Sequence, residues 1–337
     1  MRSPIAERAP YVVAAFGVLV ASVLIAPLIG SSNISFARVF DFGIPYDQNV
    51  DRQIFFIARL PRALAAAIVG ASLAAAGVVF QALLRNPLAT PYTLGVSTGA
   101  SLGAMLAITF GWSLPGVLSR VLPAASAAAL IGAMGSVLIV YWLARARHSG
   151  LSTTVLLLAG VTLNAFFSAL ILFVQYIGNF ADVYRAMRWL MGNLDVSSYG
   201  QIAGALPFVA LAAGIFVWLA KPLNLMAAGV DAAESRGLDV QRTQRLAFFS
   251  ASVITGAAVS IGGPIGFVGI IVPHLVRLVA GADHRIVLPA SAFVGGAFLV
   301  GCDVIARTIL APVELPVGIV TATIGGPFFL WMLIRRS

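Results

Sequence analysis

The chain has 337 residues, of which 60% are hydrophobic and only 10% are charged, and its mean hydropathy is +0.99. Soluble domains carry charge on about a quarter of their residues, and a soluble fold of this length has too small an interior for so much apolar surface, so that class is excluded. The formal net charge of +9 would suggest nucleic acid in a soluble protein, whereas here a basic bias toward one membrane face explains it. We therefore expect no nucleic-acid partner.

Ten apolar runs predict membrane-spanning helices, which need about 20 residues each. The first run is longer than the core of a signal peptide, so we expect it to stay uncleaved. Gly262, Gly263 and Pro264 separate the seventh run from the eighth, and they favour a reversal there, although one kinked helix is an alternative. The expected spans are 11–30, 61–84, 94–110, 121–143, 154–177, 201–220, 246–262, 265–280, 286–310 and 315–334.

The distribution of charge supports ten spans. With the N-terminus inside, most of the 21 basic residues fall on inner segments, as the positive-inside rule requires. Merging the seventh and eighth spans would move Arg335 and Arg336 outside and weaken that bias. Small residues crowd the helices, which allows close packing. We therefore predict an all-α integral membrane protein, a compact bundle of about ten helices that forms a single domain over residues 1–337, with both termini cytoplasmic.

Several chemistries lack the residues that they need. Lys221 is the only lysine, and Ala220 precedes it, so the Gly-Lys pair of a P-loop is excluded and the chain is no P-loop ATPase by itself. Cys302 is the only cysteine, which excludes an intramolecular disulfide and a C-x-x-C motif. His274 follows Pro273, and no second ligand accompanies it, so a packed histidine is favoured over a haem or metal ligand. We expect no metal site, no cofactor and no enzymatic activity on this chain.

Asp303 and Arg307 are the main ionisable candidates inside the spans. They lie four residues apart on an expected helix and so fall on one face, where a structural ion pair is favoured over a proton pathway. The chain therefore resembles a conduit without its own energy source, which needs either an ion gradient or a separate ATPase.

Five motifs occur in order along the chain. They are Arg59-Leu-Pro-Arg62, the segment from Arg85-Asn86-Pro87 to Gly99-Ala100, the segment Gly266–His274, Asp283-His-Arg285, and Glu314-Leu-Pro-Val-Gly318. The ordered set, from about residue 59 to the C-terminus, resembles the FecCD-type permeases, which import cobalamin, iron–siderophores and haem. The resemblance implies a type II ABC importer permease fold in a bacterial inner membrane. It also implies a second permease subunit, two ATPase subunits that bind ATP and Mg, and a periplasmic or lipid-anchored binding protein.

The resemblance assigns a docking role to three arginines at the outer face. Arginines at the positions of Arg59, Arg62 and Arg307 face acidic residues on the binding protein in this family, where charge-assisted pairs steer docking. Arg59 and Arg62 lie three residues apart, and Pro61 suits a first helical turn. Without the resemblance, both would be read as basic residues that snorkel to a membrane interface.

The resemblance identifies residues 221–245 as the cytoplasmic loop that carries a pair of short coupling helices, which rest in a groove of the ATPase. A surface helix that lies on lipid is the alternative. Val230 stands where relatives often have an acid, and Arg236 stands where leucine is usual, so the choice of ATPase partner is open. The expected coupling residues are Leu225, Met226, Gly229, Asp231, Gly237 and Leu238.

The resemblance also implies a constriction at the inner end of the pathway, formed by Asn86, Leu88, Thr153 and Thr154. Without it, Thr153 and Thr154 would be read as a helix N-cap. The segment 189–193 is read either as a short helix at the outer entrance or as an interfacial aromatic anchor.

The leading hypothesis is an importer permease that works as a dimer, homodimeric rather than heterodimeric, and passes a metal chelate through alternating access. By family frequency the substrate leans to an iron–siderophore or haem over cobalamin. The rival is a secondary transporter driven by an ion gradient, which the shortage of intramembrane charges disfavours. A non-transporting scaffold is a third reading, disfavoured by polar residues that recur in one region: Thr162, Asn164, Ser168 and Gln175.

Overall fold

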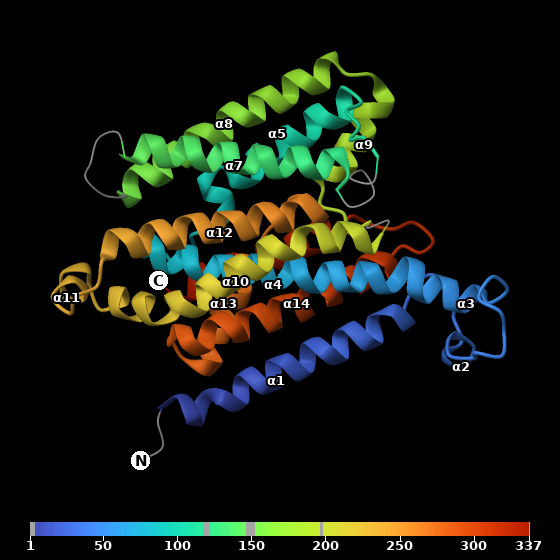
Figure 1. Ribbon diagram of the computed structural model, residues 1–337, viewed down its shortest axis with the longest axis horizontal. Coiled ribbons are helices and arrows are strands. Elements are labelled where there is room, and N and C mark those ends of the chain that lie inside the picture. Colours follow the sequence, from blue (N-terminus) through green and yellow to red (C-terminus); the bar gives the residue numbers. More distant parts are fainter. Residues whose placement is uncertain (1–3, 117–121, 146–151, 196–197, 337) are drawn as a thin grey trace.

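The computed structural model describes residues 4–116, 122–145, 152–195 and 198–336, and these residues form helices and connecting segments without a strand. Ten helices occupy the places of the ten expected spans (Figure 1). They are α1 (Pro4–Ile25), α4 (Leu60–Leu83), α5 (Val96–Thr109), α7 (Ala124–Arg145), α8 (Thr153–Ile177), α10 (Tyr199–Ala227), α12 (Val240–Gly262), α13 (Val268–Ala280), α14 (His284–Thr308) and α15 (Val317–Arg336).

Short elements fill the connections. These are η1 (Ala26–Leu28), α2 (Phe36–Val39), α3 (Val50–Gln53), the π-helical turn η2 (Ile54–Arg59), η3 (Pro91–Leu94), α9 (Phe180–Leu190) and α11 (Val230–Glu234). Because α3, η2 and α4 are continuous, the second span runs over Val50–Leu83 rather than from residue 61.

Two expected spans, 94–110 and 265–280, are found as helices that are somewhat shorter than expected. Seven helices in the described part of the chain are long and apolar enough to cross a membrane, whereas α5 and α13 have only 14 and 13 residues. At 1.5 Å per residue these reach about 20 Å, short of a hydrocarbon core of about 30 Å. Glycine, proline and positive-φ residues before each helix shorten it. Residue 121, the expected start of the fourth span, lies outside the described residues.

Helix α4 lies at the centre of the bundle and packs against α10, α12, α13 and α14. Figure 1 shows α5, α7 and α8 as a separate layer on one side of this core and α1 on the other. The burial follows this order, because 83% of the apolar window of the second span is buried but only 17% of that of α1. The sequence of α4 explains its place, since its alanines and glycines let neighbouring backbones approach closely.

Two glycine pairs set the closest approaches of α4. A Cβ on Gly77 would lie 2.1 Å from the carbonyl oxygen of Gly269 in α13, and one on Gly70 would lie 2.2 Å from that of Gly295 in α14. Neither position has room for a side chain unless a helix moves. The two contacts therefore fix how α13 and α14 lie against α4.

The break between α12 and α13 is a reversal, which confirms the expected separation of the seventh and eighth spans. Gly263 and Phe267 adopt positive φ angles of 68° and 67°. Beyond the break, Gly269 lies against the middle of α4, and Arg277 donates a hydrogen bond to Gln81 near the end of α4. Helix α13 therefore runs back toward the end from which α12 came, and a single kinked helix is excluded.

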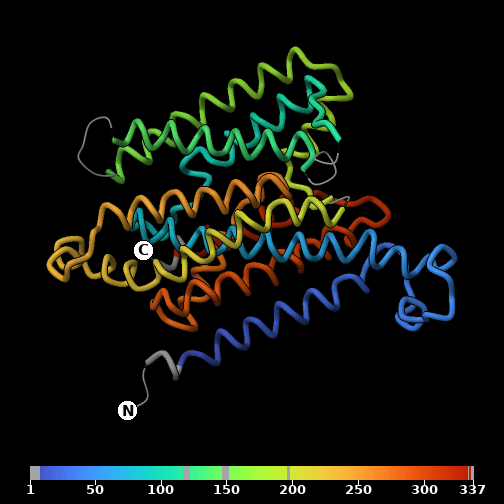
Figure 2. The backbone as a smooth tube through the Cα atoms, viewed as in Figure 1, coloured from blue at the N-terminus to red at the C-terminus, as the bar shows by residue number. Residues whose placement is uncertain are grey.

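Both chain ends lie at the same end of the bundle, since α1 begins and α15 finishes there, while the α2–α3 segment projects from the opposite end (Figure 2). We name them the inner end and the outer end, following the orientation expected from the charge bias. Helix α11 projects from the inner end (Figure 1).

The glycine contacts give a stability prediction. Gly77→Ala should lower the thermal midpoint of the purified protein in detergent, since overpacking a tight contact costs about 1–3 kcal/mol. The matched control is Gly214→Ala in α10, where a Cβ meets no atom within 4 Å and alanine favours the helix. Equal midpoints for the two variants would contradict the close contact between α4 and α13.

Candidate functional site

The three arginines expected to dock a partner gather at the outer end, where the ends of η1, η2 and α14 meet. The π-helical turn η2 positions two of them: the Leu60 N–H bonds to the Phe55 carbonyl, and Pro61 has no N–H to continue an α-helical ladder. Such wide turns are frequent at functional sites. We name Arg59, Arg62, Asp303, Arg307 and Glu314 the outer arginine cluster.

Asp303 is the centre of the outer arginine cluster. Its two carboxylate oxygens lie 2.7 Å from Nε of Arg62 and 3.0 Å from Nε of Arg307, and the Asp303 side chain is 1% exposed. Nη1 of Arg62 also donates to Glu314 over 2.5 Å, and the Glu314 side chain is 44% exposed. The Asp303–Arg307 pair expected from the sequence is confirmed, whereas the links from Arg62 to Asp303 and Glu314 were not foreseen.

Backbone carbonyls satisfy the remaining guanidinium groups. Arg59 donates to the carbonyls of Pro27, Leu28 and Ser32, and Arg307 donates to those of Ala26 and Ile29. These carbonyls follow the last turn of α1, where a helix leaves acceptors without intrahelical partners. The arginines therefore tie the end of α1 to α4 and α14. Their side chains are buried, which does not fit residues that merely snorkel into solvent.

The cluster has a surplus of positive charge beside a cavity. Three arginines face two carboxylates, and the cavity of about 190 Å³ is polar and half open. It has room for one side chain but not for a metal chelate. The arrangement can accept an acidic side chain from outside. The lining residues are Gly30, Ser31, Ser32, Ile54, Ala58, Arg59, Arg62, Arg307 and Glu314.

The expected coupling residues lie together at the inner end, in a shorter segment than expected. Lys221–Ala227 still belongs to α10, and residues from Val240 onward already belong to α12, so the connection is 228–239 and contains one short helix rather than two. Gly229 and Gly237 turn the chain with φ angles of 124° and 79°.

A small apolar core holds this segment in shape. Met226, Ala233 and Val240 are buried together, and Leu225, Val230 and Leu238 pack against them. Asp231 points to solvent on α11. The segment 228–239 therefore exposes charged side chains to solvent above a small packed core.

The four expected gate residues lie at the inner ends of α4 and α8. Asn86 accepts a hydrogen bond from the Leu88 N–H over 2.9 Å, which closes a tight turn after α4. The N-cap of α8 is Ser152, so the reading of Thr153 and Thr154 as the cap was wrong. Among the described residues no hydrogen bond joins the two pairs, so the gate stays a prediction.

A hydrogen-bond network at the inner end was not predicted from the sequence. Asn224 of α10 donates to Asp283 over 2.7 Å and accepts from the backbone N–H of His284 over 2.9 Å. Arg285 binds the same carboxylate, with Nη2 2.6 Å from Oδ2. These hydrogen bonds, that from Arg285 above all, hold the pKa of Asp283 below its usual range. The Asp283-His-Arg285 motif was the available signal, but spacing alone does not reveal Asn224.

The polar residues of α8 have different roles. Asn164 accepts from Thr98 over 2.6 Å and donates to the Tyr92 carbonyl over 2.8 Å, so it ties α8 to α5 and η3. Thr162 and Ser168 are exposed. His274 packs its ring 6.4 Å from that of Phe328, as expected of a packed histidine.

Residues near 189–193 lie in and just after α9, an 11-residue helix that ends where three connections meet. Gly318 at the start of α15 donates to the Gly192 carbonyl over 3.3 Å, and a Cβ on Gly263 would lie 2.4 Å from the Trp189 carbonyl. Helix α9 packs against α5, and a short helix at this point agrees with the first of the two expected readings of residues 189–193.

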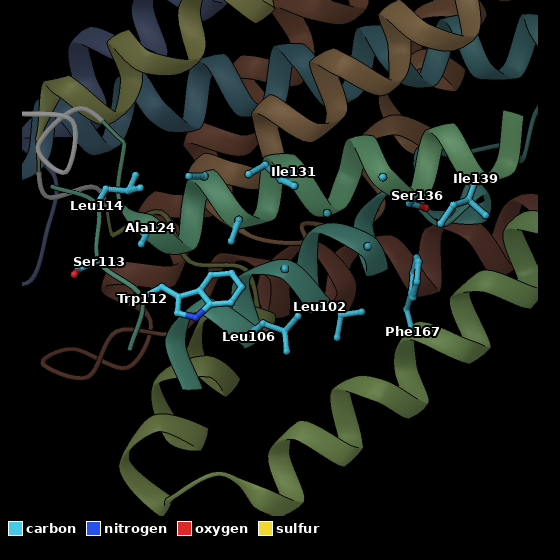
Figure 3. A pocket seen from close by; sticks show the side chains of 16 residues that line it. Leu102, Leu106, Trp112, Ser113, Leu114, Ala124, Ile131, Ser136, Ile139 and Phe167 are labelled. Atoms are coloured by element: carbon cyan, nitrogen blue, oxygen red, sulfur yellow. The ribbon is translucent and has the colours of Figure 1, made fainter. Parts of the chain in front are cut away.

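An apolar cavity of about 440 Å³ lies between α5 and α7 (Figure 3). Trp112 lies at one end of it and Phe167 at the other, and glycines of both helices leave its wall without side chains. None of the expected site residues lines this cavity. It therefore carries no part of the predicted mechanism.

The long apolar helices, with charged clusters at both ends of the bundle, define a multi-pass membrane protein. Comparisons with known proteins agree. A profile of the FecCD transport family matches residues 18–335. The chain belongs to the FecCD transport family.

Three known proteins are similar to this chain over most of its length. The cobalamin import system permease protein BtuC of Halobacterium salinarum is 45% identical over 90% of this chain and 79% of its own. The hemin transport system permease protein HmuU of Yersinia pestis is 38% identical over 82% of each chain. A solved metal-chelate type ABC transporter in an inward-facing conformation matches with a TM-score of 0.82 and 30% identity, covering 97% of this chain and 99% of that one.

The outer arginine cluster predicts a large difference between its two acids. Asp303→Asn leaves the buried Arg307 guanidinium without a carboxylate partner and leaves Arg62 with only the half-exposed Glu314, so the free energy of unfolding should fall by on the order of 3–5 kcal/mol. Glu314→Gln should cost under about 1 kcal/mol, because that carboxylate is partly solvated. Thermal midpoints in one detergent would show this order, and equal losses would contradict a central role for Asp303.

Proposed function

We propose that this chain is the membrane-spanning permease subunit of a binding-protein-dependent ABC importer that moves a metal chelate into the cytoplasm. Two copies form the pathway between them, and two separate ATPase subunits bind ATP and Mg and drive alternating access. The inner end faces the cytoplasm, so both termini are cytoplasmic. The chain itself performs no covalent chemistry.

The outer arginine cluster carries this proposal. Its surplus guanidinium charge and its small open cavity suit an acidic side chain on a soluble partner. Electrostatic pairing of this kind steers encounter and fixes the register of docking. Arg59 has no carboxylate partner among the described residues, since carbonyls and the Ser32 hydroxyl take its hydrogen bonds. An incoming carboxylate would therefore gain most from Arg59.

The segment 228–239 supports a partner at the inner end. A rigid base beneath exposed polar residues is suited to transmit a push into α10 and α12, which it joins directly. Both helices pack against the central α4. Movement of an ATPase against α11 would thus reach the middle of the bundle.

The exposed face of α8 supports a pathway between two copies. Only 22% of its apolar window is buried in a single chain. Thr162 and Ser168 are exposed on it among large apolar side chains, whereas lipid-facing surfaces are almost wholly apolar. A second copy across this face would enclose those hydroxyls.

Within metal chelates we place cobalamin first. The relative at 45% identity imports cobalamin by its name, and the one at 38% carries haemin. This reverses the lean toward iron chelates that family frequency gave. Both ligands are bulky metal-bearing tetrapyrrole-type macrocycles, so a wide pathway suits either.

The test is ATP hydrolysis by the chain co-purified with its ATPase in lipid, with and without the loaded binding protein. Arg59→Gln should abolish most of the stimulation by the binding protein, because the unpaired docking charge is lost. The control is Arg38→Gln, an exposed outer arginine that does not line the cavity. Both variants are assayed well below their thermal midpoints, because Arg59→Gln also removes hydrogen bonds to the segment after α1. Full stimulation in Arg59→Gln would contradict docking at the cluster.

The coupling segment gives a second prediction. Asp231→Arg on exposed α11 should reduce recovery of the ATPase with the chain, because it reverses a charge at the proposed contact. Gln241→Arg adds the same side chain on the exposed face of α12 and should leave recovery unchanged. Co-purification in detergent measures both. Equal recovery with Asp231→Arg and with the parent would remove α11 from the interface.

A further inference from the structure

A large cavity at the inner half of the bundle takes no part in the proposed transport path. It has a volume of about 710 Å³, within the range of about 300–1,000 Å³ that is usual for ligand pockets. It lies between α10 and α14, with Ala75 of α4 at its floor. This places it on the opposite side of α4 and α12 from α8, whose exposed face is the proposed pathway (Figure 1).

The walls of the cavity are apolar and its inner mouth is basic. Small side chains leave the space open, and Phe216, Trp218 and Phe293 border it, while Lys221 and Arg285 stand at the inner end. Phe16 of α1 packs its ring 5.2 Å from that of Phe293, so α1 extends the wall. The small lining residues are Ala75, Ala213, Ala220 and Ala292.

The charge at the mouth is positive. Lys221, the only lysine of the chain, is exposed, and no carboxylate of the described residues lies within ion-pair distance of it. Arg285 uses Nε and Nη2 to bind Asp283, which leaves Nη1 for another acceptor. The Arg8 guanidinium lies against Gly281, two residues before Asp283, and adds a third basic group nearby.

We propose that this cavity binds one anionic phospholipid of the membrane, with its phosphate at Lys221 and Arg285 and an acyl chain along Phe216, Trp218 and Phe293. A basic mouth above apolar walls, between transmembrane helices, matches both parts of such a lipid. A soluble anion would match only the mouth, and an uncharged lipid only the walls. The inference does not depend on the ATPase or on the substrate.

The lipid would brace α10 against α14. Asn224 already links these helices through Asp283 and His284 just inside the mouth. A bound phosphate would add a second link, between Lys221 of α10 and Arg285 of α14. Since α10 leads directly into the segment 228–239, occupancy of the cavity would stiffen the base of the proposed coupling element.

The test is retention of lipid by the purified chain in detergent, with phosphatidylglycerol and phosphatidylcholine added separately and adducts counted by native mass spectrometry. The parent should retain phosphatidylglycerol preferentially. Lys221→Gln/Arg285→Gln should reduce that retention roughly tenfold or more, as each basic residue near a membrane surface contributes about 1 kcal/mol. Ala213→Phe, at an exposed wall position, should reduce retention of both lipids.

The matched control is Arg145→Gln/Arg245→Gln, which removes two exposed inner arginines that do not line the cavity and should keep the preference. If the double variant unfolds, Lys221→Gln alone carries the test, because that side chain is exposed. Equal loss in the control pair, unchanged retention in Lys221→Gln/Arg285→Gln, or displacement of the lipid by inorganic phosphate alone would overturn the proposal. Loss of ATPase stimulation with lipid retention intact would instead fault only the proposed function.

Discussion

Asp303 is a buried carboxylate at the outer end of a mostly apolar bundle, and the packing of three helices there depends on its ion pairs. A carboxylate that is 1% exposed is tolerated only beside compensating charge, and Arg62 of α4 and Arg307 of α14 supply it. Arg307 in turn binds the carbonyls that end α1. One buried acid thus joins three helices and holds a surplus of positive charge at the surface where a partner would arrive.

The outer arginine cluster and the segment 228–239 are both joined to helices that pack directly against the central α4. The glycine pairs at Gly70 and Gly77 let α13 and α14 touch α4, so a displacement at either end is carried by packed backbones. The half-length α13 and the break before it lie at the middle of α4. In the proposed function, these contacts would let α4, α13 and α14 move together as one block.

Much of the fold could be predicted from the sequence. Apolar runs of sufficient length fixed the number and order of the helices, and the Gly262-Gly263-Pro264 break was visible, because bilayer length and backbone chemistry act locally. The short reach of α5 and α13 was not visible, since their ends depend on turns buried among other helices. At the site, the pair four residues apart was predictable, but Arg62–Asp303 and Asn224–Asp283 join residues 241 and 59 positions apart, which only the packed fold reveals.

In the proposed function, ATP, and not an ion gradient, drives a metal chelate through this chain. Arg62, Asp303 and Arg307 of the outer arginine cluster are fixed in ion pairs, which disfavours them as carriers of protons or sodium. The most direct measurement is uptake of labelled cobalamin by proteoliposomes that contain the chain and its ATPase, with the binding protein outside and ATP inside. We expect uptake that needs ATP and does not change when a proton or sodium gradient is imposed. Uptake driven by such a gradient without ATP would contradict the proposed function.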